Sequence, residues 1–142
     1  MMMKETQTLV MYTDGGARGN PGPAGIGVVL KDVHGKNVAT IANSIGERTN
    51  NQAEYEAVLA GLQRARELGA AELRCFLDSQ LVAEQLSRRY KVKDAELAKL
   101  FVQCWNAMQS FSSVTFQYIP REKNKEADAL VNQAIDEALS HR

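Results

Sequence analysis

The sequence lacks the features that set a chain apart from ordinary globular domains. It has two cysteines, two histidines and three prolines in 142 residues, and 6% aromatic residues. The two cysteines, Cys75 and Cys104, lack the spacing of a metal site and fit buried apolar positions better than a disulfide. No apolar run approaches membrane-spanning length, and residues 1–7 lack the apolar core of a secretory signal. We therefore expect a cytoplasmic protein that does not associate with membranes.

Neither sign of charge is in excess. The chain has 17 basic and 17 acidic residues, a balance unusual for a nucleic-acid-binding protein. The basic residues nevertheless form two local groups, one at Arg88, Arg89, Lys91 and Lys93 and the other at Arg121, Lys123 and Lys125. Net charge alone therefore neither supports nor excludes a nucleic-acid partner.

Hydrophobic periodicity predicts one α/β domain over residues 8–142, preceded by a disordered or extended segment at 1–7. Strands are expected at 8–14, 26–30, 38–45, 72–77 and 114–119. One helix is expected after the third strand, two between the fourth and fifth strands, and one after the fifth strand. Asn50 or Asn51 is the expected cap of the first helix, Gly69 its end, and Asp94 the cap of the third helix. The order βββαβααβα indicates a mixed sheet with helices packed on it, and the strand near Glu72 should lie parallel to the first.

Four acidic residues occur where these elements begin or end. Asp14 and Asp78 each close an apolar strand, and Glu54 and Asp128 are expected in the first turns of two helices. Parallel neighbouring strands would bring Asp14 and Asp78 to the same sheet edge, about 4.8 Å apart. Carboxylates so close raise one another's pKa and favour a hard divalent cation. Each acid alone is equally typical of a turn or helix cap, so the hypothesis of a metal-dependent enzyme depends on all four together.

Four motifs carry a family resemblance, and they occur in the family's order. They are Tyr12-Thr13-Asp14-Gly15-Gly16 with Gly19-Asn20-Pro21-Gly22, Thr49-Asn50-Asn51-Gln52-Ala53-Glu54, Asp78-Ser79-Gln80, and Asn124-Lys125-Glu126-Ala127-Asp128. Together they resemble type 1 ribonuclease H over residues 8 to about 140. The resemblance implies a ribonuclease H-like fold, with a five-stranded mixed sheet and helices on both faces.

The resemblance also implies an activity, hydrolysis of the RNA strand of RNA–DNA hybrids with two Mg²⁺ ions, Mn²⁺ being an alternative. The products would carry 5′-phosphate and 3′-hydroxyl ends. Asp14 would be shared by both ions, Glu54 and Asp78 would hold the ion near the leaving oxygen, and Asp128 the other ion. We expect the protein to act as a monomer.

Further positions match the family's contacts to the hybrid. These are Gly15, Gly16, Asn20, Thr49, Asn51, Gln80 and Arg121. The two glycines are equally typical of a tight turn that requires positive φ, and Asn20 and Asn51 of a turn and a helix cap. Both interpretations of these residues remain open at this stage.

The chain departs from the family pattern in two places. Many members carry a histidine in the loop after the last strand, where this chain has Arg121, which stays charged and cannot act as a base. We expect Arg121 to assist electrostatically. A long basic, tryptophan-rich handle found in some members is reduced here to residues 88–93, which predicts modest, strongly salt-dependent binding or else a merely solvated connector.

Two other functions fit the same motifs. One is another metal-dependent nuclease on the same fold, such as an exonuclease or a strand transferase. The other is a hybrid-binding module without catalysis. Because a binding module gains nothing from clustering four repelling carboxylates, the endonuclease is the leading hypothesis.

Overall fold

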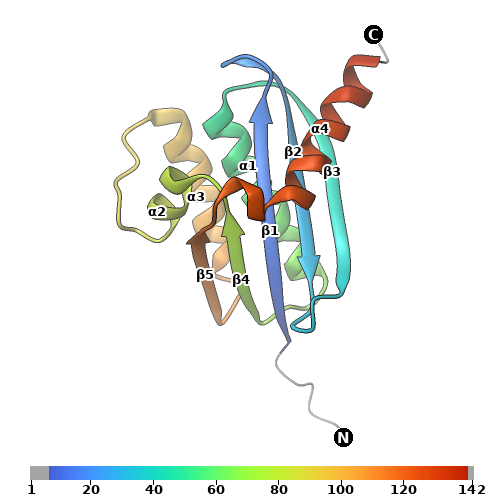
Figure 1. Ribbon diagram of the computed structural model, residues 1–142. Helices are drawn as coiled ribbons and strands as arrows, with labels where there is room; N and C mark the ends of the chain where they lie inside the picture. The colour runs from blue at the N-terminus through green and yellow to red at the C-terminus, as the bar shows by residue number, and fades with distance from the viewer. Residues whose placement is uncertain (1–6, 141–142) are drawn as a thin grey trace, which may run out of the picture.

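The computed structural model describes residues 7–140 of the chain (Figure 1). The elements are β1 (Thr8–Ala17), β2 (Gly22–Lys31), β3 (Asn37–Arg48), α1 (Asn50–Glu67), β4 (Glu72–Leu77), α2 (Gln80–Leu86), α3 (Ala95–Met108), β5 (Ser113–Tyr118), the short 3-10 helix η1 (Arg121–Lys123) and α4 (Lys125–Ser140). Their order confirms the expected βββαβααβα, with η1 as an addition. The expected N-terminal segment 1–7 lies almost wholly outside the described residues.

The five strands form one mixed sheet in the order β3-β2-β1-β4-β5. β1, β2 and β3 are an antiparallel meander, whereas β4 pairs parallel with β1, and β5 parallel with β4. The parallel pairing of β1 and β4 follows from the helical connection between them, because a strand reached through a crossover helix returns in the same direction.

Helices cover both faces of this sheet. In Figure 1, α4 crosses the front over β2 and β3, while α1 and α3 lie behind the sheet. No helix among residues 7–140 combines the length and apolarity needed to cross a bilayer.

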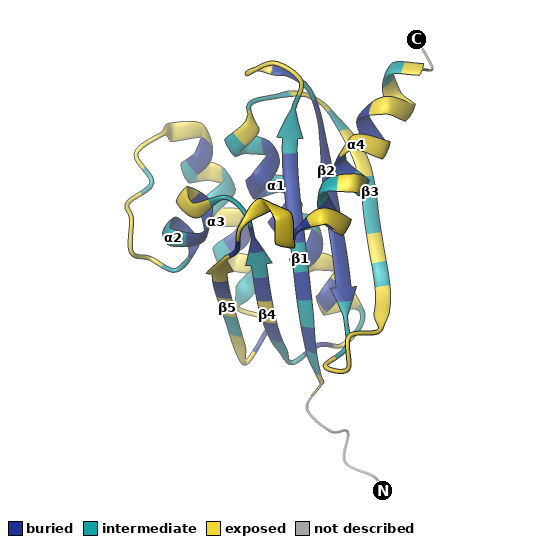
Figure 2. Cartoon of the chain, in the orientation of Figure 1, coloured by how far each residue is buried: buried dark blue, intermediate teal, exposed yellow. Residues whose placement is uncertain are grey.

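The core lies between β1, β2, β4 and α1, where Figure 2 shows the buried residues. Leu9 and Met11 of β1 and Val58 and Leu62 of α1 have no exposed surface. Each such apolar side chain contributes about 1.5–3 kcal/mol on burial. α3 is less buried than α1, since Leu97 and Cys104 are its buried residues. The core therefore fixes β1, β4 and α1 to one another, and these elements carry three of the four acids.

Two sequence expectations about the start of α1 are wrong. The N-cap is Thr49, not Asn50 or Asn51, because its hydroxyl accepts from the Gln52 amide at 3.2 Å and the Gln52 side chain accepts from the Thr49 amide at 2.9 Å. This reciprocal capping box satisfies two backbone amides at the start of the helix. Since α1 begins at Asn50, Glu54 lies in its second turn rather than its first. The expected end of α1 at Gly69 (φ +83°) and the expected N-cap of α3 at Asp94 are confirmed.

The expectation of a turn at Gly15-Gly16 is also wrong. β1 continues to Ala17, with Gly15 opposite Ile26 and Gly16 opposite Gly25, and the left-handed glycine of the following turn is Gly19 (φ +103°). The pairing with β2 carries the strand past Asp14, so the carboxylate projects from within a strand.

Candidate active site

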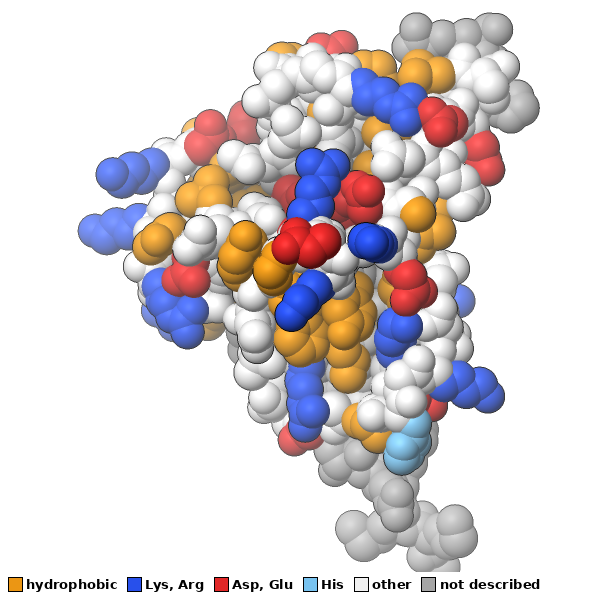
Figure 3. Space-filling view, in the orientation of Figure 1, with side chains coloured by type: hydrophobic (Ala, Val, Ile, Leu, Met, Phe, Trp, Pro, Cys, Tyr) orange, Lys and Arg blue, Asp and Glu red, His pale blue; other side chains and the backbone are white. Residues whose placement is uncertain are grey.

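Three of the four sequence-predicted acids meet at one point of the structure. One carboxylate oxygen from each of Asp14, Glu54 and Asp78 lies within 4.8 Å of the others. Asp14 and Glu54 are 7% exposed, and Asp78 is half-buried. Figure 3 shows acidic side chains gathered near the middle of this face beside basic ones. Asp14, Glu54 and Asp78 line a hollow of about 430 Å³.

Strand register places the first pair of acids. Thr13 of β1 is the parallel partner of Leu77 of β4, so Asp14 and Asp78 each follow one member of the same pair. Since neighbouring strands lie about 4.8 Å apart, the two carboxylates emerge side by side. The sequence expectation for this pair is therefore confirmed.

Close packing at Gly15 places the third acid. An ideal Cβ on Gly15 would lie 2.2 Å from the Ala53 carbonyl carbon and 2.5 Å from the Glu54 amide nitrogen. Only a residue without a side chain lets the start of α1 approach β1 this closely. The glycine after Asp14 thus serves to bring Glu54 against the strand.

Asp128 stands at the rim of the hollow and is not part of the three-carboxylate group. It lies in the first turn of α4, as expected, and its side chain is 31% exposed. α4 reaches this position because Gly27 of β2 has no side chain. An ideal Cβ on Gly27 would lie 2.2 Å from the Ala127 carbonyl oxygen, too close for any residue but glycine. Arg121 of η1, with its side chain 79% exposed, places Nη2 3.6 Å from the Asp128 carboxylate.

Burial and mutual repulsion disfavour negative charge on the three clustered acids. Burial, followed by the charge of Asp78, raises the pKa of Asp14 to about 7. Burial, followed by the charges of Asp14 and Asp78, raises the pKa of Glu54 well above its ordinary value. Burial also raises the pKa of Asp78, against the lowering effects of a hydrogen bond from Asn124 and the charge of Arg121. Near neutral pH the cluster therefore favours a positive partner.

The donor set fits a hard divalent cation. All three ligand atoms are carboxylate oxygens, which Mg²⁺ and Mn²⁺ prefer over the nitrogen and sulfur donors typical of zinc. Glu54 Oε2 is buried and has no hydrogen-bond partner among residues 7–140. An unsatisfied buried carboxylate oxygen is costly, and a bound cation would satisfy it.

Comparisons with known proteins agree with this geometry. The family model described as reverse transcriptase-like matches residues 12–134. The bifunctional protein Rv2228c of Mycobacterium tuberculosis is 45% identical over 131 residues, covering 92% of this chain and 36% of that protein. Ribonuclease HI of Halobacterium salinarum is 41% identical over 127 residues, covering 89% of this chain and 64% of its own length. The structure of LC11-RNase H1 in complex with an RNA/DNA hybrid has a TM-score of 0.89 and 44% identity, covering 92% of this chain and 99% of that one.

The chain belongs to the ribonuclease H family. It spans about a third of the Mycobacterium relative and under two thirds of the Halobacterium relative. The fold predicted from the sequence is that of the family, with a five-stranded mixed sheet and helices on both faces.

Three of the residues predicted to contact substrate line a second hollow in this ribonuclease H-family chain. Asn20, Thr49 and Asn51 line a hollow of about 620 Å³ together with Asp94 and Glu96. Part of this set is structural, because Thr49 caps α1 and the Asn20 side-chain oxygen accepts from the Asn50 amide at 3.0 Å.

The remaining predicted contacts lie closer to the acids or apart from them. Gly15, Gly16 and Arg121 line the same hollow as the four acids. Gln80 is exposed at the first position of α2 and lines neither this hollow nor the second one.

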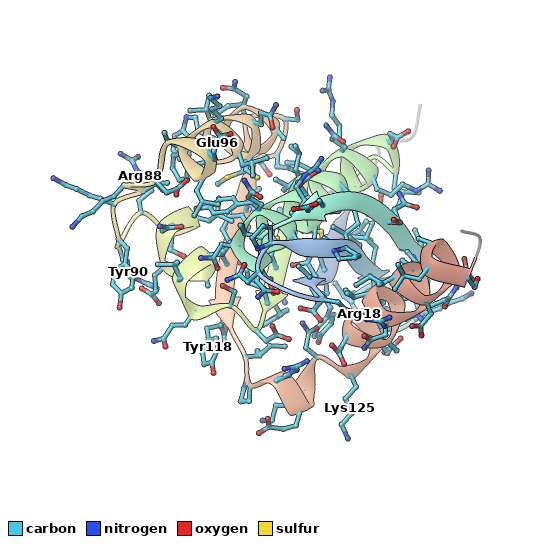
Figure 4. All side chains as sticks on the ribbon, turned by 90° about the horizontal axis from the view of Figure 1, so that it is seen from above. Arg18, Arg88, Tyr90, Glu96, Tyr118 and Lys125 are labelled. Atoms are coloured by element: carbon cyan, nitrogen blue, oxygen red, sulfur yellow. The ribbon has the colours of Figure 1, made fainter. Side chains whose placement is uncertain are left out.

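The basic segment 88–93 lines neither of the two hollows in the ribonuclease H-family fold. Seen from above, Arg88 and Tyr90 stand at the opposite side of the molecule from Arg18 (Figure 4). Arg88 lies over the Trp105 ring, 5.0 Å from its centre, and Arg89 pairs with Glu84 at 3.3 Å. Trp105 thus has a half-buried place beside a cation.

Sequence reasoning missed several residues of the site. Asn50 lines both hollows and accepts from the Ala17 amide at 2.9 Å, and Arg18 lines the hollow beside the acids and pairs with Asp136 at 2.7 Å. Asn124 is buried against Asp78, although the sequence marks it only as the start of the last helix. No local pattern distinguishes these residues from ordinary turn and cap residues. Their roles depend on contacts with distant segments.

Proposed function

We propose that this chain is a divalent-metal-dependent endoribonuclease that hydrolyses the RNA strand of RNA–DNA hybrids. Its products would have 5′-phosphate and 3′-hydroxyl ends. The observation that carries the proposal is the convergence of Asp14, Glu54 and Asp78 beneath Asp128 in a ribonuclease H-family fold. A relative that is 44% identical binds an RNA/DNA hybrid in its solved structure, which supports the same substrate class here.

The four acids would hold two cations, with Asp14 shared between them, Glu54 and Asp78 on one and Asp128 on the other. Bound ions of this kind lower the pKa of an attacking water and neutralise charge on a leaving oxygen. The chain itself supplies the orientation. Asp14 lies within a paired strand and Glu54 within a helix packed on that strand, so the backbone that carries the two carboxylates is already in place before the reaction.

Arg121 has the exposure and charge to contact a substrate phosphate at the edge of the hollow. It stays protonated and cannot remove a proton from water. His34, the one histidine within residues 7–140, lies in the exposed turn between β2 and β3 and does not line the hollow beside the four acids. We therefore assign Arg121 a role in binding and charge neutralisation.

Several finer features belong to the same proposal. We expect two Mg²⁺ ions, with Mn²⁺ as a substitute, because the donors are all oxygens. We expect residues 8–142 to form a single catalytic domain that acts as a monomer in the cytoplasm. The two free, buried thiols Cys75 and Cys104 suit a reducing compartment.

The decisive experiment compares the wild-type chain with Asp14→Asn on a labelled RNA–DNA hybrid, duplex DNA and duplex RNA. We expect metal-dependent cleavage of the hybrid alone, and a loss of turnover on the order of a hundredfold to a thousandfold in the variant. Hybrid affinity should persist in the variant, since the acid does not itself attract the nucleic acid.

The matched control is Glu137→Gln, which removes a carboxylate charge from the exposed side of α4 at a residue that does not line the hollow. It should cleave the hybrid like the wild type. Equal cleavage of duplex DNA would favour a different metal-dependent nuclease on this fold, and no cleavage by the wild type would favour a non-catalytic binding module.

A further inference from the structure

One buried polar side chain beside the acids has no role in the function described so far. Asn124 lies between η1 and α4 and is 2% exposed. Its side-chain nitrogen donates to the Thr13 carbonyl at 2.8 Å and to the Asp78 carboxylate at 3.1 Å. Its main-chain carbonyl accepts from the Asp128 amide at 3.1 Å. A single residue therefore contacts β1 next to Asp14, the acid after β4 and the first turn of α4.

The hydrogen bonding of this side chain is uneven. Both protons of the Asn124 amide are used, but its Oδ1 is buried and has no partner among residues 7–140. Buried polar atoms without partners destabilise a fold, so packing alone would favour an apolar residue of the same shape here. Only the two donors distinguish asparagine from leucine at this position. One of these hydrogen bonds is to Asp78 of the carboxylate cluster, and the other is to Thr13, the residue before Asp14.

We infer that Asn124 is a positioning residue of the metal site, holding the Asp78 carboxylate and the start of α4 in register with Asp14. The inference rests on the proposed metal-dependent function and assigns a residue to it. Asp78 directly follows β4, where the backbone leaves the sheet, and it is only half-buried. The Asn124 amide fixes one oxygen of that carboxylate before any cation arrives.

Such a contact changes the affinity of the site for a metal ion rather than the chemical step. A ligand whose orientation is already fixed loses less rotational freedom when it binds a metal, and outer partners of this kind typically change metal affinity about 10- to 100-fold. The same amide also ties Asp78 to the Thr13 carbonyl, the residue before Asp14. Loss of Asn124 should therefore loosen the spacing between the two acids as well as the orientation of one.

The test measures metal binding in the absence of substrate. Asn124→Leu keeps the branched shape and the number of heavy atoms of the side chain and removes both donors, and Asn124→Ala removes the side chain beyond Cβ. Titration calorimetry with Mn²⁺ at constant pH should show dissociation constants raised about tenfold or more in both variants. Melting temperatures in a chelator would report any loss of stability separately.

Gln85→Leu is the matched control. Gln85 is 4% exposed, accepts from the Tyr55 hydroxyl at 2.7 Å and donates to the Lys91 carbonyl at 3.4 Å. It is a buried amide that does not contact any of the four acids. This variant should lose stability but bind Mn²⁺ like the wild type.

Folded Asn124 variants that bind Mn²⁺ within twofold of the wild type would overturn the inference. If neither variant folds, nitrogen-15 NMR of the wild-type chain decides instead. Asn124 side-chain amide signals should exchange slowly with solvent and shift on addition of Mg²⁺, and unresponsive signals would refute the role. Hybrid cleavage is assayed separately: a wild type that binds metal but does not cleave would contradict the proposed function and leave the role of Asn124 to the binding comparison.

Discussion

Two adjacent glycines in β1 have different surroundings at the scale of single atoms. A Cβ on Gly15 would meet the Ala53 carbonyl group at 2.2 Å, whereas a Cβ on Gly16 would meet only the Val131 Cγ1 at an ordinary 3.7 Å. The contact at Gly15 is with backbone, which cannot rotate away. The same sequence pair therefore contains one position where a side chain is excluded and one where it is tolerated.

We predict that Gly15→Ala lowers the free energy of unfolding by about 1–3 kcal/mol or more, because α1 must move away from β1. Gly16→Ala should change it by less than about 1 kcal/mol. Urea denaturation of both variants in a chelator measures the difference. Equal stability of the two variants would mean that the close approach of α1 is not maintained in solution.

Arg121 is the second residue whose contribution can be isolated. We predict that Arg121→Ala weakens hybrid binding severalfold at low salt and reduces the slope of log affinity against log salt by about one, as for one lost phosphate contact. Arg121→Lys should retain the slope because it keeps the charge. Filter binding over a series of salt concentrations, together with turnover at saturating hybrid, checks this. If turnover and affinity both stay at wild-type values, Arg121 has no electrostatic role.

At the scale of elements, the basic segment 88–93 connects α2 to α3. Of the exposed basic segments, it has the smallest role in the proposed function. Lys91 and Lys93 are exposed, while Arg88 and Arg89 are occupied by Trp105 and Glu84. Because Glu84 is paired with Arg89, the charge available to a nucleic acid is smaller than the sequence suggests, while Arg88 keeps its charge over the neutral Trp105 ring. A short connector of this kind favours salt-sensitive rather than tight binding.

We predict that Lys91→Gln with Lys93→Gln weakens hybrid binding and lowers the salt slope by about one to two. Arg64→Gln with Arg66→Gln is the control, since it removes equal charge from the last turn of α1, at the opposite end of that helix from Glu54. Fluorescence anisotropy with a labelled hybrid measures both pairs. An identical slope in the two double variants would identify segment 88–93 as a solvated connector.

At the scale of the whole molecule, the metal-free protein contains a cluster of acids that folding makes less acidic. The pKa of Asp14 is raised from 3.8 to about 7, chiefly by burial and then by Asp78. An acid with a raised pKa binds its proton more tightly in the folded state than in the unfolded state. The folded state is therefore favoured at low pH and loses stability as the pH rises through this interval.

We predict that the chain in a chelator becomes less stable between pH 5 and pH 8, by an amount on the order of a few kcal/mol. Adding Mg²⁺ at pH 8 should restore stability, because the cation replaces the protons. Asp32 and Glu126 have lowered pKa values and act in the opposite direction, but at more acidic pH than this window. Melting temperatures at the two pH values, with and without Mg²⁺, provide the measurement.

Asp14→Asn with Glu54→Gln is the control for this pH dependence, since neither amide titrates. The double variant should show little change of melting temperature between pH 5 and pH 8 and little response to Mg²⁺. A metal-free wild type that is more stable at pH 8 than at pH 5 would contradict the repulsion inferred for the cluster.

The order of the elements, the sheet they form and the pairing of Asp14 with Asp78 could all be deduced from the amino-acid sequence. These depend on local periodicity and on the direction in which a crossover returns a strand, and both can be deduced from neighbouring residues. The motifs also brought Glu54 and Asp128 into the same hypothesis. Local reasoning was wrong at Gly15 and at the cap of α1, where another element decides the backbone.

How the acids are held depends on contacts between segments far apart in the chain. Asn124 and Thr13 are 111 residues apart, yet one hydrogen bond joins them and a second reaches Asp78. Glu54 approaches β1 because Gly15 has no side chain, and Asp128 stands at the rim because Gly27 admits α4. Contacts of this kind depend on the distance between packed surfaces, which no pattern within a single segment contains.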